Sequence, residues 1–348
     1  MKFRRMAAVS LDPRFNVSYK NHQQNGVIVE EIEGLIRVSK DGHVERPAII
    51  PIVPSTWSLD QNLVTSKDII MDNLTNLWAR TYVPTSSPGQ QKPLLVYFHG
   101  GGFCVGSAAW SCYHEFLANL STKTNCVIIS VNYRLAPENR LPAAFEDGFN
   151  ALMWIKQQAQ SSSTENKFWL NQCNMSSPFL AGDSAGANIV YHVATRLATL
   201  DDAVLRPIRL KGTILIQPFF GGESRTGSER YASQPPNSAL TLSASDTYWR
   251  LSLPLGADRD HPWCNPLANI NNGSTKLRSS AVMVCVSETD ILRDRNLEFC
   301  NALVSSGKKV EMVMCKGVGH AFQILHNSNY SQARTQEMMS HIKSFINQ

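Results

Sequence analysis

The chain has 348 residues, a formal net charge of +5 and a hydrophobic fraction of 43%. A chain of this length can bury roughly three quarters of its unfolded surface, which is enough for one large domain or two small ones. The composition excludes two classes: no stretch reaches the roughly 18 uninterrupted apolar residues of a membrane span, and Lys and Arg are too scattered to indicate nucleic-acid binding.

The cysteines and histidines argue against a metal centre. The eight cysteines have no Cys-x-x-Cys spacing, and histidine and cysteine never cluster at the spacing of metal ligands. We therefore expect reduced thiols, no metal and no cofactor. The apolar run at the basic start is interrupted by Asp12 and is too short for a signal peptide, with Met1 and Met6 both candidate starts. These features predict a protein of the cytoplasm or nucleus that is not secreted.

The N-terminal part differs from the rest of the chain in its pattern of polar and apolar residues. Residues 1–25 are polar and are expected to be flexible or draped over the body, and the alternation from Val27 to Glu33 is interpreted as the beginning of a short helix. Two short apolar runs flank Asp41-Gly42, which is a strong hairpin signal. We treat residues 1–68 as an N-terminal segment separate from the alternating part of the chain.

From about Ile69 onward, strands and helices alternate. Predicted strands cover residues 77–83, 94–98, 126–131, 178–181, 208–216, 281–286 and 310–315, and predicted helices cover 142–155, the stretch after Ser184, 293–304 and 331–346. This order predicts an α/β fold with a mostly parallel sheet and helices on both faces, over residues 69–348. Residues 219–263 interrupt the alternation. We interpret them as a cap over the site, the alternative being a surface excursion without a role in binding.

The stretch around Ser184 is the strongest local signal. A short apolar strand, the turn Gly182-Asp183-Ser184-Ala185-Gly186 and a helix follow one another. This order matches a nucleophile elbow, in which a strained turn exposes the serine hydroxyl and places the next backbone N–H at a helix N-terminus. Side chains two residues before and after the serine would collide, which suits Gly182 and Gly186. The alternative is an ordinary glycine-rich turn.

A serine nucleophile needs a base and an acid, which follow it in this order along the chain. His320 lies in a glycine-flanked loop directly after a predicted strand and is the candidate base, whereas His192 and His261 are better explained as packing or turn residues. Asp290, on the loop after the preceding strand, is the candidate acid. Glu288 and Asp294 are the other carboxylates within reach, and Asp294 is also explained by capping of the next helix.

The second half of an oxyanion hole is predicted upstream. His99-Gly100-Gly101-Gly102 directly follows the strand 94–98, and consecutive glycines leave backbone N–H groups unshielded. We expect this loop, together with the N–H of Ala185, to form the oxyanion hole. Aromatic residues near these motifs are candidate pocket walls or core residues: Phe103, Phe219, Phe220 and Trp249.

The motifs as a set resemble one family. They are His99-Gly100-Gly101-Gly102-Phe103, Asn132-Tyr133-Arg134-Leu135-Ala136-Pro137-Glu138, Gly182-Asp183-Ser184-Ala185-Gly186, Asp290-Ile291-Leu292 and Gly319-His320-Ala321-Phe322. From about residue 7 onward, the chain resembles the plant carboxylesterases of the hormone-sensitive-lipase-like branch of the α/β-hydrolases. The resemblance implies Ser184 as nucleophile, His320 as base, Asp290 as acid, and an oxyanion hole from Gly101, Gly102 and Ala185. It also implies a cap to which the N-terminal segment of residues 1–68 and the 219–263 insertion contribute.

The same branch contains proteins that do not hydrolyse esters. The gibberellin receptors resemble this fold with the catalytic histidine replaced, and some dehydratases and cyclases carry threonine in place of the elbow serine. Because this chain keeps Ser184, Asp290 and His320, we expect a serine carboxylesterase for small or medium esters, with a small-molecule ester as its partner and no obligate protein partner. A hormone-type receptor and a lyase or cyclase that retains the triad are the alternatives.

Overall fold

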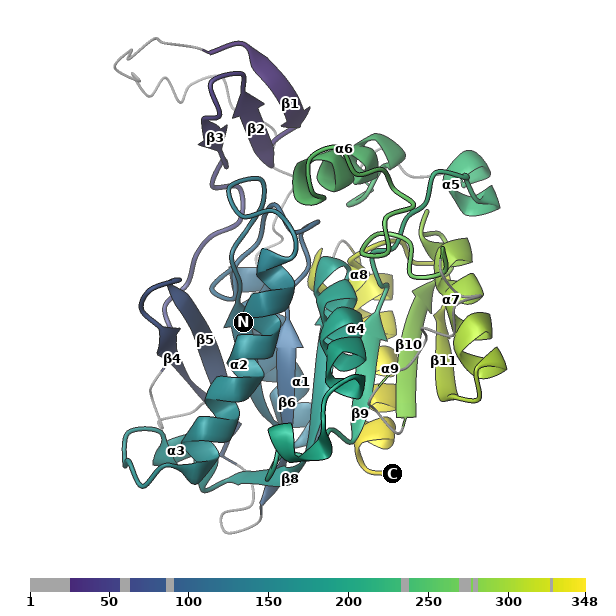
Figure 1. The fold of residues 1–348 in the computed structure, drawn as a ribbon. Coiled ribbons are helices and arrows are strands. Elements are labelled where there is room, and N and C mark those ends of the chain that lie inside the picture. The colour runs from purple at the N-terminus through teal and green to yellow at the C-terminus, as the bar shows by residue number, and fades with distance from the viewer. Residues whose placement is uncertain are drawn as a thin grey trace, which may run out of the picture.

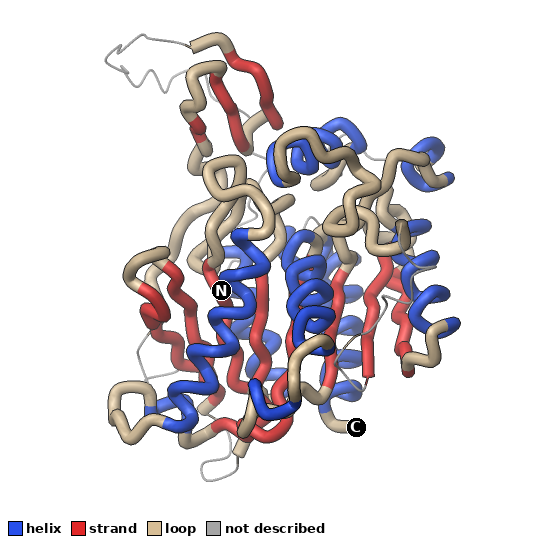
Figure 2. Tube along the Cα trace, in the orientation of Figure 1, coloured by secondary structure: helices blue, strands red, loops and turns tan. Residues whose placement is uncertain are grey.

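The computed structural model describes residues 26–56, 63–85, 91–232, 238–268, 277, 281–325 and 328–348. Its centre is an eight-stranded sheet in the order β11-β10-β9-β8-β6-β7-β5-β4 (Figures 1 and 2). The six strands β11, β10, β9, β8, β6 and β7, neighbours in this order, pair in parallel, and β5 and β4 add an antiparallel edge beside β7. The strands of this sheet are β4 (Val64–Asp72), β5 (Leu77–Pro84), β6 (Lys92–Phe98), β7 (Val127–Asn132), β8 (Cys173–Asp183), β9 (Gly212–Ile216), β10 (Ala281–Ser287) and β11 (Lys309–Cys315).

Helices cover both faces of the sheet, as the alternation of elements predicts. One hydrophobic core lies beneath α2, α4 and α7, and a second lies beneath α1 and α9 (Figure 1). The continuous apolar run of β6 is fully buried because both faces are covered. The described helices are α1 (Ser111–Thr124), α2 (Ala143–Gln160), α3 (Lys167–Leu170), α4 (Ala185–Ala198), the 3₁₀ helix η1 (Asp202–Val204), α5 (Gly227–Tyr231), α6 (Leu242–Ser252), α7 (Arg293–Ser305), α8 (Phe322–Leu325) and α9 (Asn329–Ile346). None of these described helices is long and apolar enough to cross a membrane.

The parallel strands bring their carboxyl ends to one edge of the sheet. The loops after β6, β8, β10 and β11 carry the glycine-rich motif, Ser184, Asp290 and His320, respectively. Open α/β sheets place their sites outside the carboxyl ends of the strands. The topology therefore gathers residues that are far apart in the sequence at one edge.

The N-terminal segment forms a small sheet of its own, in the order β1 (Ile28–Ile32), β2 (Ile36–Ser39) and β3 (Val44–Glu45). The hairpin predicted around Asp41-Gly42 is confirmed by the antiparallel pairing of β2 with β3. The short helix predicted from Val27 is wrong. This segment contains consecutive β-branched residues and pairs with β2 as a strand. The expectation for residues 1–25 lies outside the described residues.

The small sheet and the 219–263 insertion both lie beyond the carboxyl ends of the strands (Figure 1). The insertion contains α5 and α6, and α6 packs near β1. Arg250 of α6 forms a bidentate ion pair with Glu30 of β1, with Nε at 2.7 Å from Oε1. Two segments separated by 220 residues therefore meet above the same edge of the sheet.

Candidate active site

Ser184 occupies the turn between β8 and α4. Its backbone lies at φ 52° and ψ −119°, a region that non-glycine residues rarely occupy. A Cβ on Gly182 would overlap the backbone of Gly186, and one on Gly186 would overlap the carbonyl of Phe98. The close approach of strand, turn and helix therefore requires glycine at both positions. This strained turn has the geometry of a nucleophile elbow.

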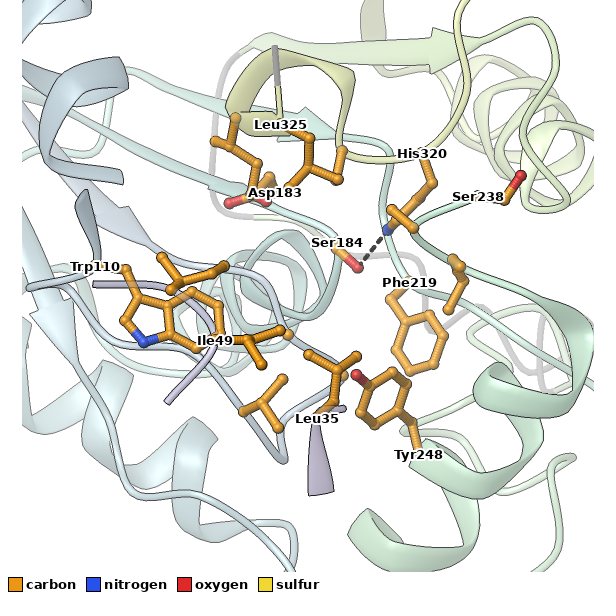
Figure 3. Close-up of a pocket in the computed structure, with 18 of the residues that line it drawn as sticks. Leu35, Ile49, Trp110, Asp183, Ser184, Phe219, Ser238, Tyr248, His320 and Leu325 are labelled. Carbon is orange, nitrogen blue, oxygen red and sulfur yellow. Dashed lines mark hydrogen bonds between the residues drawn. The ribbon is translucent and has the colours of Figure 1, made fainter. Parts of the chain in front are cut away.

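His320 lies between Ser184 and Asp290. Its Nδ1 is 2.7 Å from Oδ2 of Asp290, and its Nε2 is 2.8 Å from Oγ of Ser184 (Figure 3). Because an ionised carboxylate only accepts hydrogen bonds, Nδ1 carries the proton and Nε2 is free to accept from the serine hydroxyl. Asp290 is buried and also accepts from the backbone N–H of Leu292 at 3.0 Å.

The other candidate acids and bases lie elsewhere. Glu288 accepts from the backbone N–H of Gly317, and Asp294 lies in the first turn of α7, where it accepts from the N–H of Ser228. His192 is half-buried and stacks on Phe145 with a ring-centroid distance of 4.4 Å, and desolvation of its ring lowers its pKa to about 3. The structure therefore brings together the three residues that chain order favoured.

Two glycines of the predicted oxyanion loop face the cavity beside Ser184. Gly101 and Gly102 line it, with φ of +112° and +58°. Within the described parts of the chain, the backbone N–H groups of Gly101, Gly102 and Ala185 have no hydrogen-bond partner. The ring of Tyr248, from α6, lies so close over Gly102 that a Cβ at this glycine would overlap it.

The assignment of His99 and Gly100 to the oxyanion hole is wrong. The N–H of Gly100 already donates to the hydroxyl of Tyr113 at 2.7 Å and to Oδ1 of Asp183 at 3.1 Å. His99 is fully buried, donates from Nδ1 to the carbonyl of Gly100 at 2.7 Å and stacks on Tyr133. Burial lowers its pKa to about 4, so its ring is neutral. Both residues therefore fix the conformation of the loop and do not line the described cavity.

Asp183 is a residue of the site that the sequence analysis did not single out. Its buried carboxylate accepts from the hydroxyls of Tyr97 at 2.7 Å and Tyr113 at 2.9 Å, as well as from Gly100. Burial raises its pKa to about 6, although these hydrogen bonds oppose the rise. The side chain joins the elbow to the oxyanion loop. Its position within the Gly-x-Ser-x-Gly turn was the available signal.

A cavity of about 340 Å³ opens in front of Ser184, and its wall is mainly apolar (Figure 3). The N-terminal segment, the loop after β6, the insertion and α8 all contribute, with Leu35, Ile49, Ile50, Val105, Trp110, Phe219, Leu240, Tyr248, Ile324 and Leu325 in the wall. Glu33 is the one charged side chain of the described wall that does not belong to the elbow or to His320.

Of the four aromatic residues predicted as pocket walls, the structure places only Phe219 in the described wall. Trp249 stacks behind Phe219 with a centroid distance of 4.5 Å, and Phe103 packs against both rings. Phe220 points the other way, onto Phe299. The prediction is therefore wrong for Phe103, Phe220 and Trp249, which are core residues.

Comparisons with known proteins agree with this architecture. Residues 95–324 match the family described as alpha/beta hydrolase fold. The chain is 50% identical to probable carboxylesterase 6 of Arabidopsis thaliana over 94% of each chain, and 36% identical to a gibberellin receptor of the same plant over 82% of this chain and 81% of the receptor. It is also 37% identical to a 3-O-acetylpapaveroxine carboxylesterase of Papaver somniferum over 77% of this chain and 84% of that protein.

A solved esterase of the archaeon Pyrobaculum calidifontis superposes with a TM-score of 0.66 at 29% identity, over 81% of this chain and 84% of the esterase. The fold and these similarities define the class of the protein: the chain belongs to the α/β-hydrolase fold family. Within that family it belongs to the branch of the plant carboxylesterases, as its motifs indicate.

Proposed function

We propose that the protein is a serine carboxylesterase that hydrolyses small to medium uncharged esters through an acyl-enzyme. The observation that carries the proposal is the pair of hydrogen bonds that links Ser184 to His320 and His320 to Asp290, at 2.8 and 2.7 Å. Relatives and structural neighbours named as carboxylesterases and esterases support it. Residues 1–68 and 219–263 form the cap in this proposal, over the hydrolase domain of residues 69–348.

The proposed reaction uses each group in a defined role. Ser184 Oγ attacks the ester carbonyl while His320 Nε2 takes its proton, and Asp290 stabilises the imidazolium that forms. The carbonyl oxygen becomes negatively charged beside the N–H groups of Gly101, Gly102 and Ala185. One such donor typically stabilises the transition state by about 2.7–4 kcal/mol. His320 then protonates the leaving alcohol, and water, activated by the same histidine, releases the acid.

The cavity supports an uncharged substrate with apolar parts. An aliphatic and aromatic wall gains from burying apolar surface, by about 0.8 kcal/mol per methylene. Glu33 is a carboxylate of the wall, and Arg37, whose charge interacts with it, is already paired with Glu31 at 2.6 Å, so a negatively charged substrate would be repelled there. We therefore expect neutral esters to be preferred over esters that carry a second carboxylate.

The test is hydrolysis of p-nitrophenyl acetate, butyrate and octanoate by the wild type and by Ser184→Ala. Turnover that disappears in a folded Ser184→Ala protein, judged by circular dichroism, is the expected result. Comparable turnover in that variant would refute the assignment of Ser184. The order of kcat/KM along the ester series gives the acyl length that the cavity accepts.

A small-molecule receptor is the second candidate, because a relative that is 36% identical to this chain is a gibberellin receptor. Ligand binding that survives His320→Ala, with no turnover by the wild type, would favour it. A lyase or cyclase in the same cavity would be favoured instead if a fluorophosphonate failed to label Ser184 in a protein that transforms its substrate.

A further inference from the structure

Gln217 is a buried polar residue with no role in the reaction described above. It directly follows β9, is 1% exposed and does not belong to the cavity wall. Its backbone lies in the left-handed region at φ +47°, which disfavours a residue with a side chain. A backbone strained in this way persists only where surrounding contacts compensate, and the Gln217 side chain makes such contacts.

The carboxamide of Gln217 joins two loops of the site. Its Oε1 accepts from the backbone N–H of Ala321, the residue after His320, at 2.7 Å. Its Nε2 donates to Oγ of Ser287, the last residue of β10 before the Asp290 loop, at 2.5 Å. Because a backbone N–H can only donate, the Ala321 contact fixes which end of the carboxamide faces which loop.

The residues around Gln217 hold the third loop. The carbonyl of Ile216 accepts from the N–H of Ser184 at 2.8 Å, and the N–H of Phe219 donates to the carbonyl of Ser184 at 3.0 Å. The backbone N–H of Gln217 itself donates to Cys285 of β10 at 2.8 Å. The segment 216–219 is therefore bonded to the serine loop by its backbone and to the other two loops by one side chain.

We propose that Gln217 is a positioning residue that sets the imidazole of His320 between Ser184 and Asp290. The inference rests on the proposed function. Ala321 also has a positive φ, of +58°, so the chain turns sharply just after His320 and is held there by the Gln217 carboxamide. Without that acceptor, the His320 loop loses its link to β9, and the ring shifts relative to the serine hydroxyl.

Gln217→Leu removes both hydrogen bonds at similar side-chain length, and Gln217→Glu restores an acceptor for Ala321. The matched control is Asn296→Ala, which removes another buried carboxamide bonded to the same segment, through the carbonyl of Pro218 at 2.8 Å, and whose Oδ1 has no hydrogen-bond partner among the described residues. Small misplacements of catalytic groups cost about 10²-fold in rate.

With p-nitrophenyl butyrate we expect Gln217→Leu to lower kcat by about 10- to 100-fold with KM changed less than about 3-fold. The rate of fluorophosphonate labelling should fall by the same factor, Gln217→Glu should recover part of it, and Asn296→Ala should stay within about 3-fold of the wild type. Equal kcat losses in Gln217→Leu and Asn296→Ala would refute the inference, because general loosening would then explain both.

Proton NMR gives a readout that does not depend on hydrolysis. The Nδ1 proton held between His320 and Asp290 should give a far-downfield signal in the wild type and in Asn296→Ala, and it should be lost or shifted in Gln217→Leu. An unchanged signal in folded Gln217→Leu would overturn the inference. If the wild type has the signal but neither hydrolyses esters nor reacts with the fluorophosphonate, the proposed function fails. The comparison of the NMR signal between the wild type, Gln217→Leu and Asn296→Ala then decides the role of Gln217 by itself.

Discussion

The carboxyl edge of the sheet differs from the covering segments, the N-terminal segment and the 219–263 insertion, in what determines its conformation. At the edge, each functional group sits in a short loop whose backbone is fixed by strain and hydrogen bonds, as at Ser184 with φ 52° and Gln217 with φ +47°. In the covering segments, the cavity wall consists of apolar side chains such as Leu35, Ile49 and Leu240. Chemistry therefore depends on angles and distances at the edge, whereas substrate choice depends on volume and apolar area above it. Changes in the first region should affect kcat, and changes in the second should affect substrate preference.

Among the variants that test this division, Asp290→Asn is expected to have the largest effect on kcat. The variant keeps the shape of the acid, but its amide can present an N–H to His320 Nδ1 and so stabilise the wrong tautomer. We expect kcat to fall by about 10⁴-fold with little change in KM. Steady-state kinetics together with an unchanged thermal midpoint would establish this. A loss of less than about tenfold would mean that the hydrogen bond at 2.7 Å is not used in catalysis.

Gly102→Ala probes the point where the two regions touch. The new Cβ would overlap the ring of Tyr248, and φ of +58° disfavours alanine, so the loop must move. We expect kcat to fall by about 10²–10³-fold, the typical cost of losing one oxyanion donor. The double variant Gly102→Ala with Tyr248→Ala should recover part of the loss, since it removes the overlap. No recovery would show that the backbone conformation alone sets the cost.

The Asp183 carboxylate should give the edge a pH-dependent stability. Burial raises its pKa from the ordinary 3.8 to about 6, so the folded state favours the protonated form. Its contribution to the free energy of unfolding is complete below about pH 4 and is lost as the pH rises through about 6, a change of about 3 kcal/mol. Urea midpoints from pH 4 to pH 7 should show this difference between the wild type and Asp183→Asn. Parallel curves would contradict the raised pKa.

The smallest effect is expected from Leu35→Trp in the covering segment. The larger side chain reduces the volume of the cavity from the side of the N-terminal segment. We expect kcat/KM for the octanoate ester to fall by about tenfold, in line with the 1–3 kcal/mol that a hydrophobic pocket uses to discriminate one methylene. The acetate ester should be affected less than about threefold. Equal losses for both esters would mean that the wall also positions the reacting groups.

The sequence was informative where a function requires a local pattern. Ser184 could be found because a strained turn needs glycines at fixed positions, and the loops with Asp290 and His320 because they follow recognisable buried strands. The wall of the cavity left no such pattern. Phe219 and Phe220 are neighbours with equal hydropathy, yet only Phe219 lines the cavity, because packing against Phe299 turns the other ring away. Gln217 was missed since its partners lie 70 and 104 residues away.

The oxyanion loop was only partly predictable for a related reason. Three consecutive glycines mark a place where backbone N–H groups are unshielded, but they do not say which of them point to the cavity. That choice is made by Asp183 and Tyr113, which occupy the N–H of Gly100. Strand β1 was predicted as the start of a helix because its alternating pattern is too short to distinguish a helix from a strand. Its antiparallel pairing with β2 makes it a strand.

The contact of Tyr248 with Gly102 has a consequence for how the enzyme can diversify. A residue that shapes the cavity rests directly on a backbone group proposed to act in the reaction. Substitution at position 248 therefore alters substrate scope and turnover together, and selection for a new ester there has to be accompanied by adjustment of the glycine loop. Ile49, also in the wall, is not among the side chains nearest to the glycines of that loop, so a change of specificity there does not have to be accompanied by such an adjustment.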